Sequence, residues 1–280
     1  VSFSLIIMAE MMALPNPFFA HLPPQLAAGQ SLSIFGVMAV NTAVCLNLLD
    51  TKGHIVLPVD LKFNENTFEF NVGTKHGSWP NHTVKPDHPI ELRIRFHQQA
   101  FEVSINGSLM ANTPDSGNFN QIDSFEVKGG IQLTKLALGG KYYQIPDQWA
   151  FPGGPLHPGQ QLEAYVKATL NEFAVNFQCD GEAVGLHWNP QFHQNRIQYD
   201  TSKHGLEWDA KYQWDWLNNM SHPIQPNVGF HVTFVIKEKC IEVLINDNWI
   251  HTFDHPYGNE FVSFNITGNV TLESLDIRYI

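Results

Sequence analysis

Short stretches of the chain alternate between apolar and polar residues, which is the period of a β-strand with one buried face. The clearest runs cover residues 90–96 and 230–236. Each is followed by a polar turn and a second alternating stretch, at residues 101–105 and 241–245. These second stretches end in the turn-forming pairs Asn106-Gly107 and Asn246-Asp247. The pattern predicts a β-hairpin followed by a further turn at two separate places.

No segment of 12 or more residues keeps the i, i+3, i+4, i+7 apolar stripe of an amphipathic helix. Aromatic residues are plentiful, with 20 Phe, 7 Trp and 7 Tyr, and they favour strands. Turn residues recur about every 8–12 residues between the alternating stretches. Many short strands with this spacing predict an all-β fold built from antiparallel β-sandwiches.

The chain contains a long internal repeat. Trp79 and Trp208 lie 129 positions apart, and residues 47–79 align with residues 176–208 without a gap. This repeat is longer than a solenoid unit of roughly 20–50 residues and has the size of a small domain. We therefore expect two copies of one domain, with an insertion in the second copy within residues 214–224.

The expected division is an N-terminal tail at 1–17, a first domain at 18–139, a linker at 140–150 and a second domain at 151–280. The linker is short and carries Tyr142, Tyr143 and Trp149, so we expect it to pack against a domain instead of swinging freely. The apolar start of the chain has no basic region, contains Glu10 and is too short to span a membrane. Met8 is a candidate for the true first residue.

The net charge of −11 argues against partners that need a basic surface, so neither nucleic acid nor an anionic membrane is expected. The sequence contains no run of about 18 apolar residues, so we do not expect membrane insertion. Cys45, Cys179 and Cys240 form neither a disulfide framework nor a zinc spacing, and we interpret them as reduced thiols of a cytoplasmic protein. The spacing of the 14 histidines likewise suggests no metal site, and we expect no cofactor.

The stretch His187-Trp188-Asn189-Pro190-Gln191-Phe192 resembles the galectin family. The family pattern is His-x-Asn-Pro-Arg, an Asn about one strand later, and then Trp-Gly-x-Glu-x-Arg. Residues 26–32 and 156–162 also look like the family's opening strand, and the two hairpins match as well. The resemblance covers nearly the whole chain and implies two tandem galectin-type β-sandwiches of the concanavalin-like jelly-roll class.

The resemblance implies a shallow sugar-binding groove on one sheet of each domain. Polar side chains from neighbouring strands would bond the polar edge of a galactose-like sugar, and the Trp ring would stack on its C–H face. Alternate residues of a strand share a face, so His187, Asn189 and Gln191 would point into the groove together. Charge-assisted, multidentate bonds would fix the orientation of the sugar.

The second domain keeps only part of the family pattern. Gln191 replaces the family's Arg, so a charged fork becomes a neutral amide. Asp200 replaces an Asn, so the position can accept but not donate a hydrogen bond. The expected carbohydrate-binding residues of this domain are His187, Asn189, Gln191, Asp200, Trp208, Lys211 and Gln213.

The first domain departs further from the pattern. Pro58 occupies the His position and Val84 the second Arg position, so neither can offer the family's side-chain bonds. Lys62 keeps a positive charge without the planar fork of Arg. The candidate carbohydrate-binding residues of this domain are Asp60, Lys62, Asn71, Trp79 and His82.

The resemblance implies a bivalent lectin for galactose-containing or related glycans on glycoproteins and glycolipids, with the second domain as the better site and self-association as an option. Two sites on one chain would cross-link glycoconjugates. It also implies cytoplasmic synthesis with non-classical export. One alternative is a galectin-fold protein that has lost sugar binding and serves protein–protein interaction. A glycan-modifying enzyme is the other, but no facing pair of carboxylates or catalytic motif supports it, so no catalytic residue is assigned.

Overall fold

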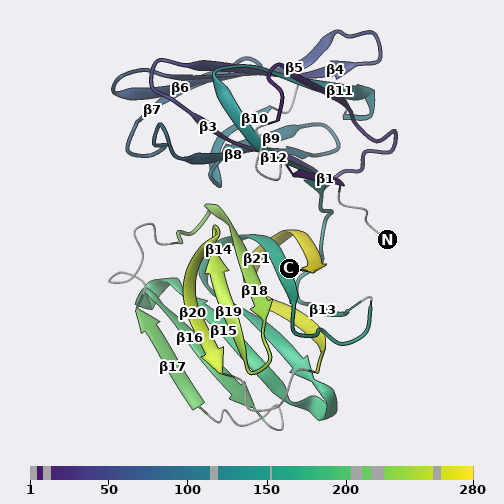
Figure 1. Ribbon diagram of the computed structural model, residues 1–280, viewed down its shortest axis with the longest axis vertical. Helices are drawn as coiled ribbons and strands as arrows, with labels where there is room; N and C mark the ends of the chain where they lie inside the picture. Colours follow the sequence, from purple (N-terminus) through teal and green to yellow (C-terminus); the bar gives the residue numbers. More distant parts are fainter. Residues whose placement is uncertain are drawn as a thin grey trace. The chain divides into compact units, whose positions relative to one another are not determined.

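The computed structural model describes residues 5–8, 14–113, 119–151, 153–202, 210–215, 224–254 and 260–279. The chain divides into two compact units, Val1–Tyr142 and Tyr143–Ile280, each of which is a layered β structure in Figure 1. Within the described ranges, the helical segments are three 3-10 turns, at Phe119–Gln121, Asp180–Glu182 and Phe192–Gln194. The prediction of an all-β fold with antiparallel sheets is confirmed.

The first unit is a sandwich of two six-stranded antiparallel sheets. One sheet has the order β2 (Phe18–His21), β11 (Ile122–Gly129), β4 (Ala43–Asp50), β5 (Ile55–Phe63), β6 (Thr67–Val72) and β7 (Lys75–Pro80). The other has the order β1 (Leu5–Met8), β12 (Ile131–Gly139), β3 (Ser31–Met38), β8 (Pro89–Phe96), β9 (Phe101–Ile105) and β10 (Ser108–Thr113).

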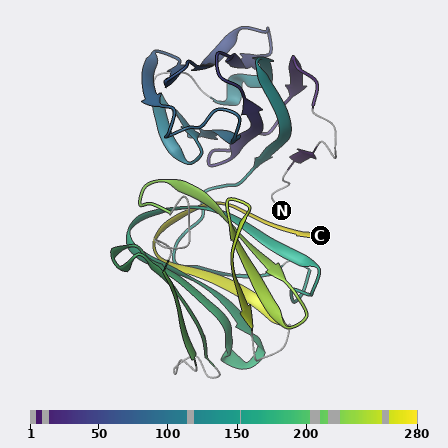
Figure 2. The same ribbon diagram turned by 60° about the vertical axis from the view of Figure 1, so that its left-hand side comes forward.

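The second unit has the same plan, but two long strands run through both of its layers, as Figures 1 and 2 show. These strands are β14 (Gln160–Cys179) and β21 (Phe261–Tyr279). The first part of β14 pairs with β18 and its last part pairs with β15, so one strand serves both sheets. The remaining strands are β13 (Asp147–Ala150), β15 (Val184–Gln191), β16 (Arg196–Ser202), β17 (Ala210–Asp215), β18 (Gly229–Ile236), β19 (Cys240–Ile245) and β20 (Asn248–Asp254).

Each core lies between the two layers and follows the alternation of the sequence. In β5, Leu57, Val59 and Leu61 are buried, while Asp60 and Lys62 between and beyond them are exposed. The largest fully buried side chains are aromatic. Each such side chain contributes about 1.5–3 kcal/mol when it is removed from water, so the inward faces hold the strands in place.

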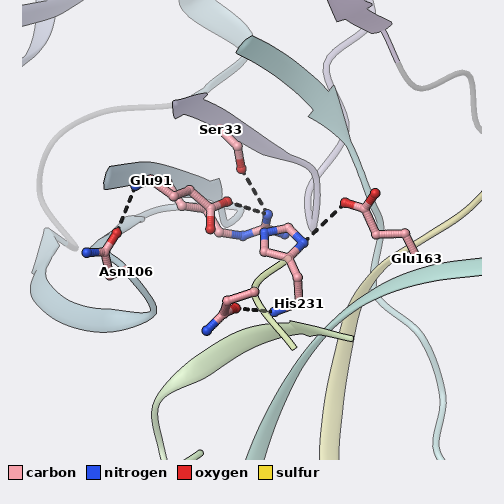
Figure 3. A network of polar contacts seen from close by, with 7 residues as sticks. Ser33, Glu91, Asn106, Glu163 and His231 are labelled. Carbon is pink, nitrogen blue, oxygen red and sulfur yellow. Dashed lines mark hydrogen bonds and ion pairs between the residues drawn. The ribbon is translucent and has the colours of Figure 1, made fainter. Parts of the chain in front are cut away.

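The two predicted hairpins are present in β8–β9 and β18–β19, and in each an asparagine that follows the second strand is bonded to the first strand. The side-chain Oδ1 of Asn106 accepts a hydrogen bond from the backbone N–H of Glu91 at 2.8 Å, and Oδ1 of Asn246 accepts one from the N–H of His231 at 2.9 Å (Figure 3). Both asparagines have positive φ, 48° and 49°, a conformation that Asn tolerates better than most residues. These asparagines, which lie in the following turns, therefore join the two strands at the open end of each hairpin.

The stretch expected to be a linker is held at both ends. Tyr142 Oη lies 2.6 Å from Nδ1 of His97, and the guanidinium of Arg95 lies over the Tyr142 ring. Tyr143 packs against the core of the second unit and contacts the ring of Trp149. Residues 147–150, which lack a strand pattern in the sequence, form β13 and pair with β21. The expected packing of the linker tyrosines against a domain is therefore observed.

Candidate functional site

In the second unit, the site residues predicted on β15 lie together on the outer face of one sheet. His187, Asn189 and Gln191 alternate with Trp188, which is fully buried in the core. On the neighbouring strand β16, the residues opposite His187 and Asn189 are Asp200 and Gln198. Directly opposite residues of an antiparallel pair point to the same side, so these side chains form one polar face.

A chain of amides holds His187 in one tautomer. Nδ2 of Asn176 donates to Oδ1 of Asn265 at 2.7 Å, which turns Oδ1 of Asn176 toward Nδ1 of His187 at 2.5 Å. Because that oxygen can only accept, Nδ1 carries the proton and Nε2 is the acceptor of the neutral ring. Burial lowers the pKa of His187 to about 4, so the ring is neutral at pH 7.

The next two side chains along β15 are already hydrogen-bonded within the protein. Asn189 donates from Nδ2 to the backbone oxygen of Phe173 at 2.6 Å. Gln191 donates from Nε2 to Oδ1 of Asn189 at 2.6 Å, and its Oε1 accepts a bond from Nε of Arg196 at 2.8 Å. Asn189 and Gln191 are only 7% and 8% exposed. Both amides are therefore fixed in orientation and largely withdrawn from solvent.

The other predicted positions of this unit are less completely described. Asp200 is 0% exposed, and its Oδ1 accepts a bond from the backbone N–H of Thr201 at 2.9 Å. In β17, Lys211 lies opposite Asp200 and Gln213 lies opposite Gln198 in the backbone pairing. The side chains of Lys211 and Gln213, and the whole of Trp208, lie outside the described residues.

The two units differ by a two-residue shift between the strands that carry the site. In the first unit Asp60 lies opposite Asn71, whereas in the second unit the repeat equivalent of Asp60, Asn189, lies opposite Gln198. Asp200, the sequence equivalent of Asn71, lies opposite His187 instead. A shift of two residues keeps every side chain on its own face, because the side-chain period of a strand is two.

In the first unit, the corresponding face is open and charged. Asp60, Lys62 and Asn71 are exposed on the same side of β5 and β6, and Glu69 lies opposite Lys62. His76 of β7 lies opposite Asn71 and extends this polar row. The structure therefore brings three of the predicted residues together, but with carboxylates and ammonium groups where the second unit has amides.

A line of polar contacts continues this face across β4 and β11. Asn47 donates from Nδ2 to Glu126 Oε1 at 2.9 Å, and Lys128 Nζ lies 2.7 Å from Glu126 Oε2. The Lys128 contact is the main reason that the pKa of Glu126 is lowered. Burial, reinforced by the neighbouring Asp60, raises the pKa of the Cys45 thiol to about 11, so this thiol is protonated at neutral pH.

Trp79 does not lie on this face, which corrects the expectation of a solvent-facing ring beside Asn71. Its backbone position is opposite Phe68, and its ring packs against Phe68 and Phe70 with ring centroids 6.2 and 5.0 Å apart. The tight turn between Val72 and Lys75 sets this register and directs Trp79 toward the core. His82 is exposed in the turn that follows β7, beyond the end of the sheet.

Comparison with known proteins decides the family. The family model described as "Galactoside-binding lectin" matches residues 17–138 and again residues 150–277. The chain is a galectin with two tandem domains. It is 22% identical over 283 residues to a 32 kDa beta-galactoside-binding lectin of Caenorhabditis elegans, covering 96% of this chain and 99% of the relative. A protein of the same name from Haemonchus contortus is 21% identical, covering 94% and 95%.

Solved galectin structures match one half of the chain at a time. The Caenorhabditis elegans galectin LEC-6 covers 49% of this galectin and 94% of its own chain, with 18% identity and a TM-score of 0.44. Sheep galectin-11 covers 49% and 99%, with 17% identity and a TM-score of 0.41. In the part of the galectin that the structure describes, no group of three His, Cys, Asp or Glu side chains could hold a metal ion, and no helix could span a membrane.

Two polar residues of the second galectin domain were not singled out from the sequence. Gln198 takes the place opposite Asn189, and Arg196 takes the place opposite Gln191. Both are half-buried and therefore more exposed than the amides of β15. The ungapped repeat alignment could not indicate either residue, because it assigns them to the positions of Glu69 and Thr67.

Proposed function

We propose that this galectin is a bivalent carbohydrate-binding lectin that recognises β-galactoside-like or altered glycans, with the second domain as the better site. The observation that carries the proposal is the row of His187, Asn189 and Gln191 on one face of β15, held in fixed orientations by hydrogen bonds. A preorganised polar face loses little conformational entropy on binding a sugar.

The first domain is proposed to bind simple galactosides weakly. Its face presents Asp60 and Lys62 where the second domain presents Asn189 and Gln191, and its tryptophan lies on the core side of the sheet. A different set of charged groups favours a different ligand, and Asn71 is the candidate site residue that keeps the family's residue type on this face.

Two sites on one chain would cross-link glycoconjugates, because the second binding event is intramolecular once the first has occurred. The ligands would be galactose-containing or related glycans on glycoproteins and glycolipids. Catalysis forms no part of the proposed function, and a turnover assay on oligosaccharides should show no product. We also propose cytoplasmic synthesis with non-classical export and leave self-association as an option.

A galectin fold that serves protein–protein interaction is the second candidate. It is favoured by one specific observation: Asn189, Gln191 and Asp200 are each less than 9% exposed. Buried amides with internal partners offer few donors to a ligand. A sandwich that has kept its fold while its site was remodelled would show this burial.

The test is a glycan array with the wild-type full chain and two full-length point variants. His187→Ala changes the second domain and Asn71→Ala changes the first. We expect the wild-type chain to bind β-galactosides, His187→Ala to lose most of this binding, and Asn71→Ala to keep it. Agglutination of glycoprotein-coated beads should fall in both variants, because cross-linking needs two sites. Absence of any bound glycan on the array would reject the lectin proposal and favour the protein–protein alternative.

A further inference from the structure

Arg196 is the first residue of β16 and lies directly opposite Gln191. The loop between the two strands contains a 3-10 turn at Phe192–Gln194 and ends with Asn195 in the left-handed conformation, at φ 51°. The N–H of Asn195 bonds the backbone oxygen of Phe192 at 3.2 Å, which closes the loop. The backbone therefore fixes Arg196 beside the site and on the same face as Gln191.

The bond between these two side chains uses only one edge of the guanidinium. Nε of Arg196 donates to Oε1 of Gln191, and within the described residues this is the hydrogen bond that Arg196 makes. The two Nη groups carry four further N–H donors. Arg196 is half-buried, whereas Asn189 and Gln191 are buried. On its other side Arg196 lies opposite Asp215 of β17 in the backbone pairing, and the side chain of Asp215 lies outside the described residues.

The guanidinium of Arg196 lies next to the position on β15 where the family's Arg is missing. The family pattern puts Arg at the position of Gln191, where this chain has a neutral amide. The shift in strand pairing brings Arg196 alongside that amide. A planar, positively charged guanidinium group therefore still lies on the face of the second domain.

We propose that Arg196 contacts the sugar in the second domain and supplies, from β16, the guanidinium that β15 lacks. This inference rests on the proposed lectin function. The Nη groups donate to adjacent oxygens on the polar edge of a neutral galactoside, while Gln191 holds the guanidinium in plane. Lysine is a poor replacement, since its ammonium lacks the planar pair of donors.

The first domain has no such group at the matching place. The residue opposite Lys62 there is Glu69, a carboxylate that accepts hydrogen bonds and cannot donate them. The inference is therefore specific to the second domain and predicts that the two domains differ in the sugar oxygens that they recognise.

The test measures binding of lactose and of immobilised neutral β-galactosides by the full chain. Arg196→Ala should weaken binding by about 10- to 100-fold, the usual effect of losing charge-assisted hydrogen bonds. Arg196→Lys should restore little of this loss. Lys239→Ala, which removes an exposed positive charge from the turn between β18 and β19, is the control and should leave binding unchanged.

A mutant cycle with Gln191→Ala separates direct contact from positioning. If Arg196 contacts the sugar, Arg196→Ala still weakens binding in the Gln191→Ala background. If Arg196 merely orients Gln191, the second substitution has no further effect, and the inference is overturned. Denaturant unfolding of each variant measures its stability and so distinguishes a folding defect from a binding defect.

The outcomes also separate this inference from the function on which it rests. A wild-type chain that binds galactosides, together with an Arg196→Ala variant that binds within twofold of it, overturns the role of Arg196 and leaves the lectin function intact. A wild-type chain that binds no galactoside overturns both.

Discussion

At the scale of single residues, burial decides which groups of the site can act. His187 has the residue type that the family pattern requires, yet burial keeps its ring neutral and Asn176 fixes its tautomer. Asn189 and Gln191 are present but already bonded to Phe173 and Arg196 within the protein. The residue type alone therefore describes the site less well than the hydrogen bonds around it.

The lowered pKa of His187 predicts a pH-dependent stability. The native state resists protonation until about pH 4, whereas an unfolded histidine accepts a proton near pH 6.5. The unfolded chain therefore binds more protons between these values, and stability falls as the pH decreases through this window. The contribution lost by pH 4.5 is about 2–3 kcal/mol, and His187→Gln should remove it.

This prediction is checked by denaturant unfolding of both proteins at pH 7 and pH 4.5, with the exposed His193→Gln as control. An NMR titration reports the His187 ring directly, and its signal is identified by its absence in His187→Gln. A His187 signal that titrates near pH 6.5 would contradict the burial described here.

At the scale of elements, strand register and turns place the site residues. A turn between Val72 and Lys75 directs Trp79 to the core side of its sheet. Residues 192–195 separate the paired Gln191 and Arg196, whereas the longer stretch 63–68 separates Lys62, the repeat equivalent of Gln191, from its partner Glu69. Asn106 and Asn246 join the open ends of equivalent hairpins with equivalent bonds. Short connections thus control which residues meet on a face of several strands.

Replacing Asn106 by Ala should destabilise the first domain by about 1 kcal/mol, because the bond to the Glu91 N–H is lost and Ala tolerates positive φ poorly. Asn106→Gly loses the bond but suits the conformation, so it should cost less. Asn246→Ala is the matched change in the second domain. Thermal unfolding of the three variants measures the effect, and equal stability of Asn106→Ala and wild type would count against this account.

Particular residues show how far the sequence predicts this structure. The strands β8, β9, β18 and β19 follow from alternation, because a half-buried strand has a side-chain period of two. The repeat predicts two sandwiches, and the motif on β15 predicts which side chains share a face. The position of Trp79 and the pairing of Asp200 could not be predicted, since both depend on turn lengths and register, which the ungapped alignment assumed to be equal.

At the scale of the whole molecule, each unit has its own core, and the chain between them is anchored to both. Tyr142 is held by His97 and Arg95 in the first unit, and Tyr143 packs in the second. Burial raises the pKa of Tyr143 to about 12, with a smaller contribution from Asp276. Two neighbouring residues thus pack in different units.

Removing the ring of Tyr142 should release the first-unit end of the connection. Tyr142→Ala loses the bond to His97 and the contact with Arg95, so backbone amides at residues 140–142 should exchange their hydrogens faster. Tyr142→Phe keeps the ring and should show a smaller change. Hydrogen exchange followed by mass spectrometry makes the comparison, and unchanged exchange in Tyr142→Ala would show that the ring is not an anchor.

The displaced pairing of β16 also bears on how duplicated genes diverge. A slip of one residue would turn Tyr199 outward and bring Asp200 into the core, and such a protein would not fold. A slip of two leaves the interior untouched and presents new groups, such as Arg196, to a ligand. The register between neighbouring strands can therefore change by an even number of residues without disturbing the core, and a sandwich of this kind acquires new specificities in discrete jumps.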